Sequence, residues 1–260
     1  MVVFFDIDGT IIDDATQIIP RSAVEAVAAL QKNGHTAIVN TGRPYGNIDP
    51  RVRAMPFAGY ICSCGAELLL NGKWIFQKKP TAQVCRYVIE SVRQCGMQVL
   101  YEAEDGLIAD GEHSTGKATA MEVAQVQKRG LPIFEVSELA EPCFLKFVTH
   151  DAPGCRREEF LKRMEPYFAP IIREGSMVEF VLHGCSKAAG MEAALSYLGE
   201  SRERVYAIGD SANDLTMFAM ADHTAAIGDA PAVLRQQAEF ITATVLEDGI
   251  EKALRHFGLI

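Results

Sequence analysis

Short apolar runs alternate with amphipathic stretches at both ends of the chain. The runs at 2–5 (VVFF), 36–40 (TAIVN) and 205–208 (VYAI) are apolar at most positions, as in parallel strands buried on both faces. After Pro20, apolar residues recur with a helical period as far as Asn33. This alternation predicts an α/β fold with a mainly parallel, Rossmann-like sheet.

The middle of the chain has a different pattern. It combines two predicted amphipathic helices with short paired strands, which is typical of an α+β insertion. The helices are expected at 81–95 and 156–167, and the strands at 98–101, 106–109, 143–149 and 177–182. We therefore expect one domain in two segments, 1–79 and 185–260, around a second domain at 80–184.

Composition fits a globular protein and excludes some partners. The chain has 260 residues, of which 48% are hydrophobic, and a net charge of −9 without any basic block. This charge argues against nucleic-acid and anionic membrane partners, and no apolar run reaches the ~20 residues of a membrane span. No basic leader precedes the first strand, and the seven cysteines are scattered, so we expect a cytoplasmic protein with reduced thiols and no obligate protein partner.

Carboxylates follow two of the apolar runs. Asp6 and Asp8 come directly after 2–5, and Asp210 and Asp214 follow 205–208. In open α/β sheets ligands bind at the carboxyl ends of the strands, so these loops are expected to meet at one edge. Two unit charges about 4 Å apart repel by roughly 4 kcal/mol at an effective dielectric of 20. A cluster of carboxylate oxygens therefore calls for a cation, and Mg²⁺ suits it better than zinc.

Two further segments could bind an anion. Thr41, Gly42 and Arg43 follow the run at 36–40 and offer a hydroxyl and backbone N–H groups. Lys187 lies at the start of a predicted helix. Helix N-termini favour anions, so a lysine there is out of place unless an acidic partner or an anion lies nearby.

These motifs, DIDGT, NTGR, a lysine after the insertion and GDSAND, occur in the order found in the haloacid dehalogenase superfamily. The C-terminal stretch from 208 resembles the Cof-type (class IIB) phosphatases in detail. The resemblance covers both core segments, whereas the insertion matches by position and size. It implies that 80–184 is a cap domain inserted in a Rossmann-like hydrolase core.

The resemblance also implies roles. Asp6 would be the nucleophile that forms an aspartyl-phosphate, and Asp8 the general acid and base. Asp6, Asp8 (through its carbonyl) and Asp210 would hold Mg²⁺. Thr41, Gly42, Lys187 and Asn213 would bind the phosphoryl oxygens, with Asp214 and Arg43 in support. The expected activity is Mg²⁺-dependent hydrolysis of small phosphorylated metabolites, sugar phosphates foremost.

Several features depart from this pattern. Cys64 replaces an asparagine that many relatives have near the active site, so leaving-group contacts are expected to differ. The segment 111–117 (GEHSTGK) resembles a P-loop, but Ala118 replaces the metal-binding hydroxyl residue, so a surface turn before a helix is expected there. A phosphomutase and a non-catalytic phosphometabolite sensor remain alternatives. A dehalogenase is disfavoured because it needs no proton donor at Asp8.

Overall fold

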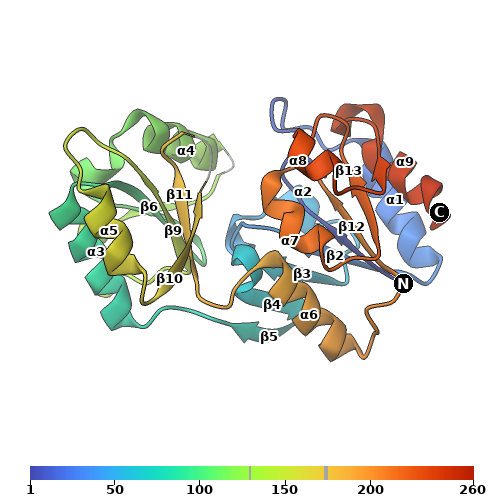
Figure 1. Ribbon diagram of the computed structural model, residues 1–260, viewed down its shortest axis with the longest axis horizontal. Helices are drawn as coiled ribbons and strands as arrows, with labels where there is room; N and C mark the ends of the chain where they lie inside the picture. The colour runs from blue at the N-terminus through green and yellow to red at the C-terminus, as the bar shows by residue number, and fades with distance from the viewer. Residues whose placement is uncertain (129, 173–174) are drawn as a thin grey trace. The chain divides into compact units, whose positions relative to one another are not determined.

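The computed structural model describes residues 1–128, 130–172 and 175–260 (Figure 1). The chain divides into two compact units. The core unit comprises Met1–Arg43, Ile48–Phe76 and Ser186–Ile260, and the inserted unit comprises Pro44–Asn47 and Gln77–Cys185.

The core unit is built on one sheet with the strand order β14-β13-β12-β1-β2-β3-β4-β5. Neighbouring strands from β14 to β3 are parallel, and β4 runs antiparallel to β3. The strands are β1 (Val2–Phe5), β2 (Thr36–Asn40), β3 (Gly59–Cys62), β4 (Glu67–Leu70), β5 (Lys73–Gln77), β12 (Val205–Gly209), β13 (His223–Ala226) and β14 (Phe240–Ile241). The mixed α/β class expected from the sequence is confirmed.

Helices cover this sheet because its strands are apolar on both faces. From α6 (Lys187–Leu198), Met191 and Leu195 pack with Phe4 of β1 in the apolar core. The helix α1 (Arg21–Lys32) begins after Pro20, where the sequence pattern places its start. The remaining helices of this unit are α2 (Pro50–Arg53), α7 (Leu215–Phe218), α8 (Ala232–Arg235) and α9 (Gly249–His256).

The strand register decides where the site forms. Phe5, the last residue of β1, lies opposite Ile208 of β12 on one side and Val39 of β2 on the other. Because these three strands are parallel and in step, the segments that follow them leave the sheet at the same edge. The motifs that begin at Asp6, Thr41 and Asp210 are therefore brought together by the sheet.

The inserted unit has its own sheet, with the order β10-β11-β9-β6-β7-β8. The strands are β6 (Gln98–Ala103), β7 (Gly106–Ala109), β8 (Ile133–Glu135), β9 (Lys146–His150), β10 (Phe168–Ile172) and β11 (Val178–Leu182). One face packs against α3 (Ala82–Cys95) and α5 (Arg157–Met164) through a core that includes Tyr101 and Phe147. Side chains alternate along a strand, so Leu100 faces the other way and packs near Val126 of α4 (Lys117–Lys128).

The structure bears on two expectations from the sequence, a surface turn in place of a P-loop and the absence of a membrane span. The P-loop-like segment forms a 3₁₀ turn, Gly111–Ser114, that leads into α4, as the surface-turn interpretation predicts. Within the described ranges, every helix is too short or too polar to cross a lipid bilayer.

Candidate active site

Asp6 lies at the point where β1 ends, in the middle of the core sheet. Its backbone N–H donates a hydrogen bond to the Ile208 carbonyl at 3.0 Å, which continues the pairing with β12. The residue is only 4% exposed. A carboxylate this deep in an apolar sheet needs a compensating positive charge, because burial in a low dielectric disfavours the charged form.

Lys187 supplies that charge. It is the first residue of α6, whose N-terminus is capped by the Ser186 hydroxyl, and its ammonium is almost completely buried. Its Nζ lies 2.8 Å from Oδ1 of Asp6 and donates to Oδ1 of Asp214 at 2.6 Å. The position of Lys187 at a helix start predicts an acidic partner or an anion nearby, and the structure provides two acidic partners, Asp6 and Asp214. Asp6 and Asp214 outweigh the effect of burial and raise the pKa of Lys187 above its usual range.

Asp214 has both oxygens engaged by protein donors. Oδ1 accepts from Lys187, and Oδ2 accepts from the backbone N–H groups of Asp210 at 3.0 Å and Ser211 at 3.1 Å. Space for this carboxylate depends on Gly209, where a Cβ atom would lie 2.5 Å from Oδ2. Asp214 thus fixes both the Lys187 ammonium and the loop that carries Asp210.

Asp210 completes the acidic group opposite Asp6. Its Oδ1 accepts a hydrogen bond from the Thr10 hydroxyl at 2.9 Å. Gly9 has φ +72°, and a Cβ atom there would lie 2.4 Å from Oδ2 of Asp210. Glycine is therefore required at this position of the DIDGT motif for two reasons. It adopts the left-handed backbone conformation, and it leaves room for the close approach of the Asp210 carboxylate.

The pKa values of the two site carboxyls reflect this crowding. With protein side chains alone, burial raises the pKa of Asp6 to about 7, although Lys187 opposes the effect. Burial and the neighbouring charges of Asp6 and Asp214 raise the pKa of Asp210 to about 9. Both carboxyls are thus short of positive charge even though Lys187 is present.

A divalent cation fits this deficit. Oxygen atoms of Asp6, Asp210 and Asp214 lie within 4.8 Å of one another. Since the oxygens of Asp214 are already engaged by N–H donors, Asp6 and Asp210 are the side chains left to hold a cation. All the donors are oxygens, and Asp210 is partly exposed, which suits a hard cation that keeps several water ligands.

Asp8 lies in a more open part of the site. Its side chain is 36% exposed and is held by the Arg43 guanidinium, whose Nε donates to Oδ2 at 2.6 Å. A second guanidinium nitrogen contacts Oδ1. The pairing is bidentate and gives the carboxylate a fixed direction.

The expected oxyanion-binding groups lie at the same sheet edge. Thr41 is buried, and its backbone N–H donates to the Ile61 carbonyl at 2.9 Å, so its place beside β3 is fixed. Oδ1 of Asn213 lies 3.4 Å from Nζ of Lys187 and accepts from the Ser211 hydroxyl at 2.8 Å. In the described part of the chain the N–H of Gly42 makes no hydrogen bond, which leaves it available to an anion.

Two residues of the site, Thr10 and Asn40, have contacts for which the sequence predicts no role. Thr10 orients Asp210, and Asn40 donates from Nδ2 to the Lys187 carbonyl at 3.1 Å, which anchors the start of α6. Both residues belong to the motifs quoted above, so their positions were visible, but their partners lie far away in the sequence. Cys64 has φ +53° and donates its N–H to the Thr41 carbonyl at 3.2 Å. Its effect on leaving-group contacts stays a prediction.

The parallel core sheet, the inserted unit and the acidic edge with a buried lysine define a class of hydrolases. The chain belongs to the haloacid dehalogenase-like hydrolases, whose family pattern matches residues 3–254. It is 27% identical over 262 residues to the putative phosphatase YkrA of Bacillus subtilis, covering 100% of this chain and 98% of the relative. It is 26% identical over 264 residues to the pyridoxal phosphate phosphatase YbhA of Escherichia coli, covering 96% and 95%.

A solved structure agrees in fold. The subclass IIB sugar phosphatase BT4131 superimposes with a TM-score of 0.81 at 23% identity, covering 100% of this chain and 99% of that protein. The family expected from the motifs is thus confirmed, together with an enzyme of the phosphoric monoester hydrolase class.

Proposed function

We propose that this enzyme is a Mg²⁺-dependent phosphatase that hydrolyses small phosphorylated metabolites, sugar phosphates foremost, through an aspartyl-phosphate on Asp6. The observation that carries the proposal is the Lys187 ammonium, buried between Asp6 and Asp214, with Asp210 beside them. This arrangement presents an anionic nucleophile next to fixed positive charge, as attack on an anionic phosphoryl group requires.

In the first step an oxygen of Asp6 attacks phosphorus and the bond from phosphorus to the leaving-group oxygen breaks. Lys187, Asn213, the Thr41 hydroxyl and the Gly42 N–H bind the phosphoryl oxygens. Asp8 gives its proton to the leaving oxygen. In the second step Asp8 takes a proton from water, the water oxygen attacks phosphorus, and the bond to Asp6 breaks, which releases inorganic phosphate.

Asp6 and Asp210, with the backbone carbonyl of Asp8, would hold Mg²⁺. When bound, the ion neutralises charge on the transferring phosphoryl group. Asp214 keeps Lys187 and the Asp210 loop in place, and Arg43 keeps the Asp8 carboxylate directed. Thr10 does the same for Asp210.

The proposal also covers the roles of the two domains and the location of the protein in the cell. We assign the catalytic core to 1–79 and 185–260 and a substrate-selecting cap to 80–184. A sugar phosphatase and a pyridoxal phosphate phosphatase among the similar proteins support a small phosphorylated substrate. Free cysteines at all seven positions agree with a reducing cytoplasm.

The test is phosphate release from a panel of sugar phosphates, pyridoxal phosphate and nucleotides, with Mg²⁺ and with EDTA. We expect turnover with Mg²⁺ and none with EDTA. Asp6→Asn should lower turnover by about 10³-fold or more because the amide is a poor nucleophile. The matched control is Asp222→Asn, since the exposed Asp222 accepts one hydrogen bond from the Val205 N–H, which an amide oxygen can keep.

Other outcomes would point elsewhere. Normal hydrolysis by Asp6→Asn would overturn the nucleophile assignment. Isomerisation of a sugar phosphate primed with a bisphosphate, without release of phosphate, would indicate a phosphomutase. Binding of a phosphometabolite without turnover would indicate a sensor.

A further inference from the structure

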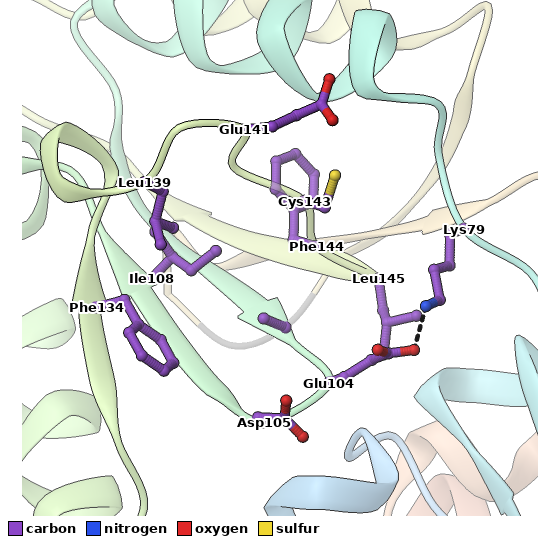
Figure 2. Close-up of a pocket in the computed structure, with 11 residues that line it drawn as sticks. Lys79, Glu104, Asp105, Ile108, Phe134, Leu139, Glu141, Cys143, Phe144 and Leu145 are labelled. Carbon is purple, nitrogen blue, oxygen red and sulfur yellow. Dashed lines mark ion pairs between the residues drawn. The ribbon is translucent and has the colours of Figure 1, made fainter.

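The inserted unit contains a cavity of about 210 Å³ on the side of its sheet that packs against α3 (Figure 2). Its inner wall is formed by Ile108 and by Phe144 and Leu145, which precede β9, and its outer wall includes Phe134 and Leu139. All of these side chains are apolar. The cavity is thus an opening into the hydrophobic core of this unit.

The side chains of the inner wall are held by their packing, so they do not shift into the cavity and fill it. Phe144 is 2% exposed and stacks on Tyr101 with ring centroids 4.7 Å apart, and it also meets the edge of Phe147 at 5.7 Å. Ile108 is equally buried. Since these side chains are fixed by neighbours on their far side, the cavity is preformed, and a ligand would not have to order it on binding.

The charged side chains that line the cavity are mostly acidic. They are the carboxylates of Glu104, Asp105 and Glu141 and one ammonium, that of Lys79. In Figure 2 Glu141 lies at one end of the lining, and the exposed Asp105 lies at the opposite end, the mouth of the cavity. Lys79 pairs with Glu104, and Glu141 lies 3.1 Å from a guanidinium nitrogen of Arg86. Asp105 makes no ion pair within the described ranges, and it is exposed. One negative charge at the mouth therefore remains uncompensated.

We propose that this cavity is a binding site for a small ligand with an apolar, preferably aromatic, body and a protonated amine. The body would occupy the space between Phe144 and Phe134, where burial of apolar surface is favourable. The ammonium would lie at the mouth near Asp105. All the residues that line the cavity belong to the inserted unit, and the inference does not depend on the proposed function.

The probe is 2-phenylethylamine, with 2-phenylethanol as its neutral counterpart of nearly equal shape. Amide chemical shifts of the ¹⁵N-labelled full chain are followed during titration of each probe. We expect shifts centred on Ile108 and Leu145, with a dissociation constant on the order of 1 mM for the amine, as suits so small a ligand. The alcohol should bind more weakly by about twofold to fivefold, since one exposed charge interaction contributes up to about 1 kcal/mol.

Three variants separate the contributions. Asp105→Asn should reduce amine affinity to that of the alcohol and leave alcohol binding unchanged. Ala103→Leu places a larger side chain in the cavity lining and should abolish binding of both probes. Glu158→Gln removes an exposed carboxylate of the same unit outside the cavity and should change neither.

The proposal fails if neither probe shifts these resonances in the wild-type protein. It also fails if the amine binds no better than the alcohol, or if Asp105→Asn leaves the preference for the amine intact. Spectra of each variant without probe establish that its fold is retained.

Discussion

Each unit of this protein buries a lysine between two carboxylates. In the core unit, Nζ of Lys187 lies 2.8 Å from one aspartate oxygen and 2.6 Å from another. In the inserted unit, Nζ of Lys146 lies 2.8 Å from Oε1 of Glu102 and also pairs with Glu179. In local charge and burial the two triplets are nearly the same.

Their backbones differ. Lys146, Glu102 and Glu179 come from the interiors or ends of adjacent strands, and Glu102 is directly opposite Lys146 in the register of β6 and β9. Their contacts run between neighbouring antiparallel strands, β6 with β9 and β9 with β11. Lys187 and its partners instead come from loops and a helix start at the carboxyl ends of parallel strands, where Asp210 and Thr10 join them. A buried charge triplet is therefore not by itself a sign of catalysis, and what distinguishes the triplet of Lys187 is the convergence of further oxygen ligands and donors at the same sheet edge.

The largest effect is expected from breaking the triplet of the inserted unit. Lys146→Met leaves two buried carboxylates without their ammonium, which should lower the free energy of unfolding by about 3–5 kcal/mol. Burial already raises the pKa of Glu102 despite the lysine. Denaturant unfolding measures the loss.

Replacing all three residues is the companion experiment. The combination of Glu102→Leu, Lys146→Met and Glu179→Leu should recover most of the lost stability, because the unpaired buried charges are gone. The recovered protein should hydrolyse its substrate. A triple variant no more stable than Lys146→Met would contradict a purely structural role.

The same change in the core unit should have a different signature. Lys187→Met removes a fixed positive charge from the reacting phosphoryl group, so we expect turnover to fall by about 10²–10³-fold, the range for loss of one such electrostatic contact. Steady-state kinetics at saturating Mg²⁺ measure it. Turnover within a few-fold of wild type would show that Lys187 has no part in the reaction and that both triplets have only a structural role.

The contrast also explains what could be predicted from the sequence. The sequence indicates Lys187 because it follows the insertion and precedes a helix in a known motif order, and it indicates Asp6 and Asp210 because they follow apolar runs. Lys146 and Glu102 carry no such signal, since 44 residues separate them in the sequence and only the strand register pairs them. Short elements such as α8 and β14 were not predicted, because two to four residues hold too little periodicity.

Metal and pH should act on Asp6 and Asp210, the two site carboxyls of the core unit whose pKa values are raised. The pKa of Asp6 is raised to about 7 and that of Asp210 to about 9, so the folded protein holds protons that the unfolded chain loses near pH 4. Without metal, this contribution to stability is complete below about pH 4 and is lost as the pH rises to about 9. Mg²⁺ competes with those protons, so its stabilising effect should grow with pH.

Thermal unfolding with EDTA or with excess Mg²⁺, between pH 5 and 9, checks this expectation. At 100 times its dissociation constant, the ion should add about 2.7 kcal/mol at high pH. Lys146→Met should show the same increment, because its triplet has no part in holding the ion. An increment that does not change with pH would contradict the link between the protons and the metal.

The smallest effect tests how far the site extends from the reacting groups. Thr10→Val keeps the shape of this fully buried side chain but removes the hydroxyl that donates to Asp210 at 2.9 Å. Groups that orient a metal ligand typically contribute about 10–100-fold to metal affinity, so the Mg²⁺ concentration for half-maximal activity should rise by about tenfold. Turnover at saturating Mg²⁺ should stay near that of wild type, because Thr10 has no role in proton or phosphoryl transfer. Thr224→Val is the matched control, since it removes a buried hydroxyl that bonds to the backbone at Gln237 and Glu239. If both variants alter the Mg²⁺ requirement equally, Thr10 acts through general stability, and the oriented part of the site ends at Asp210.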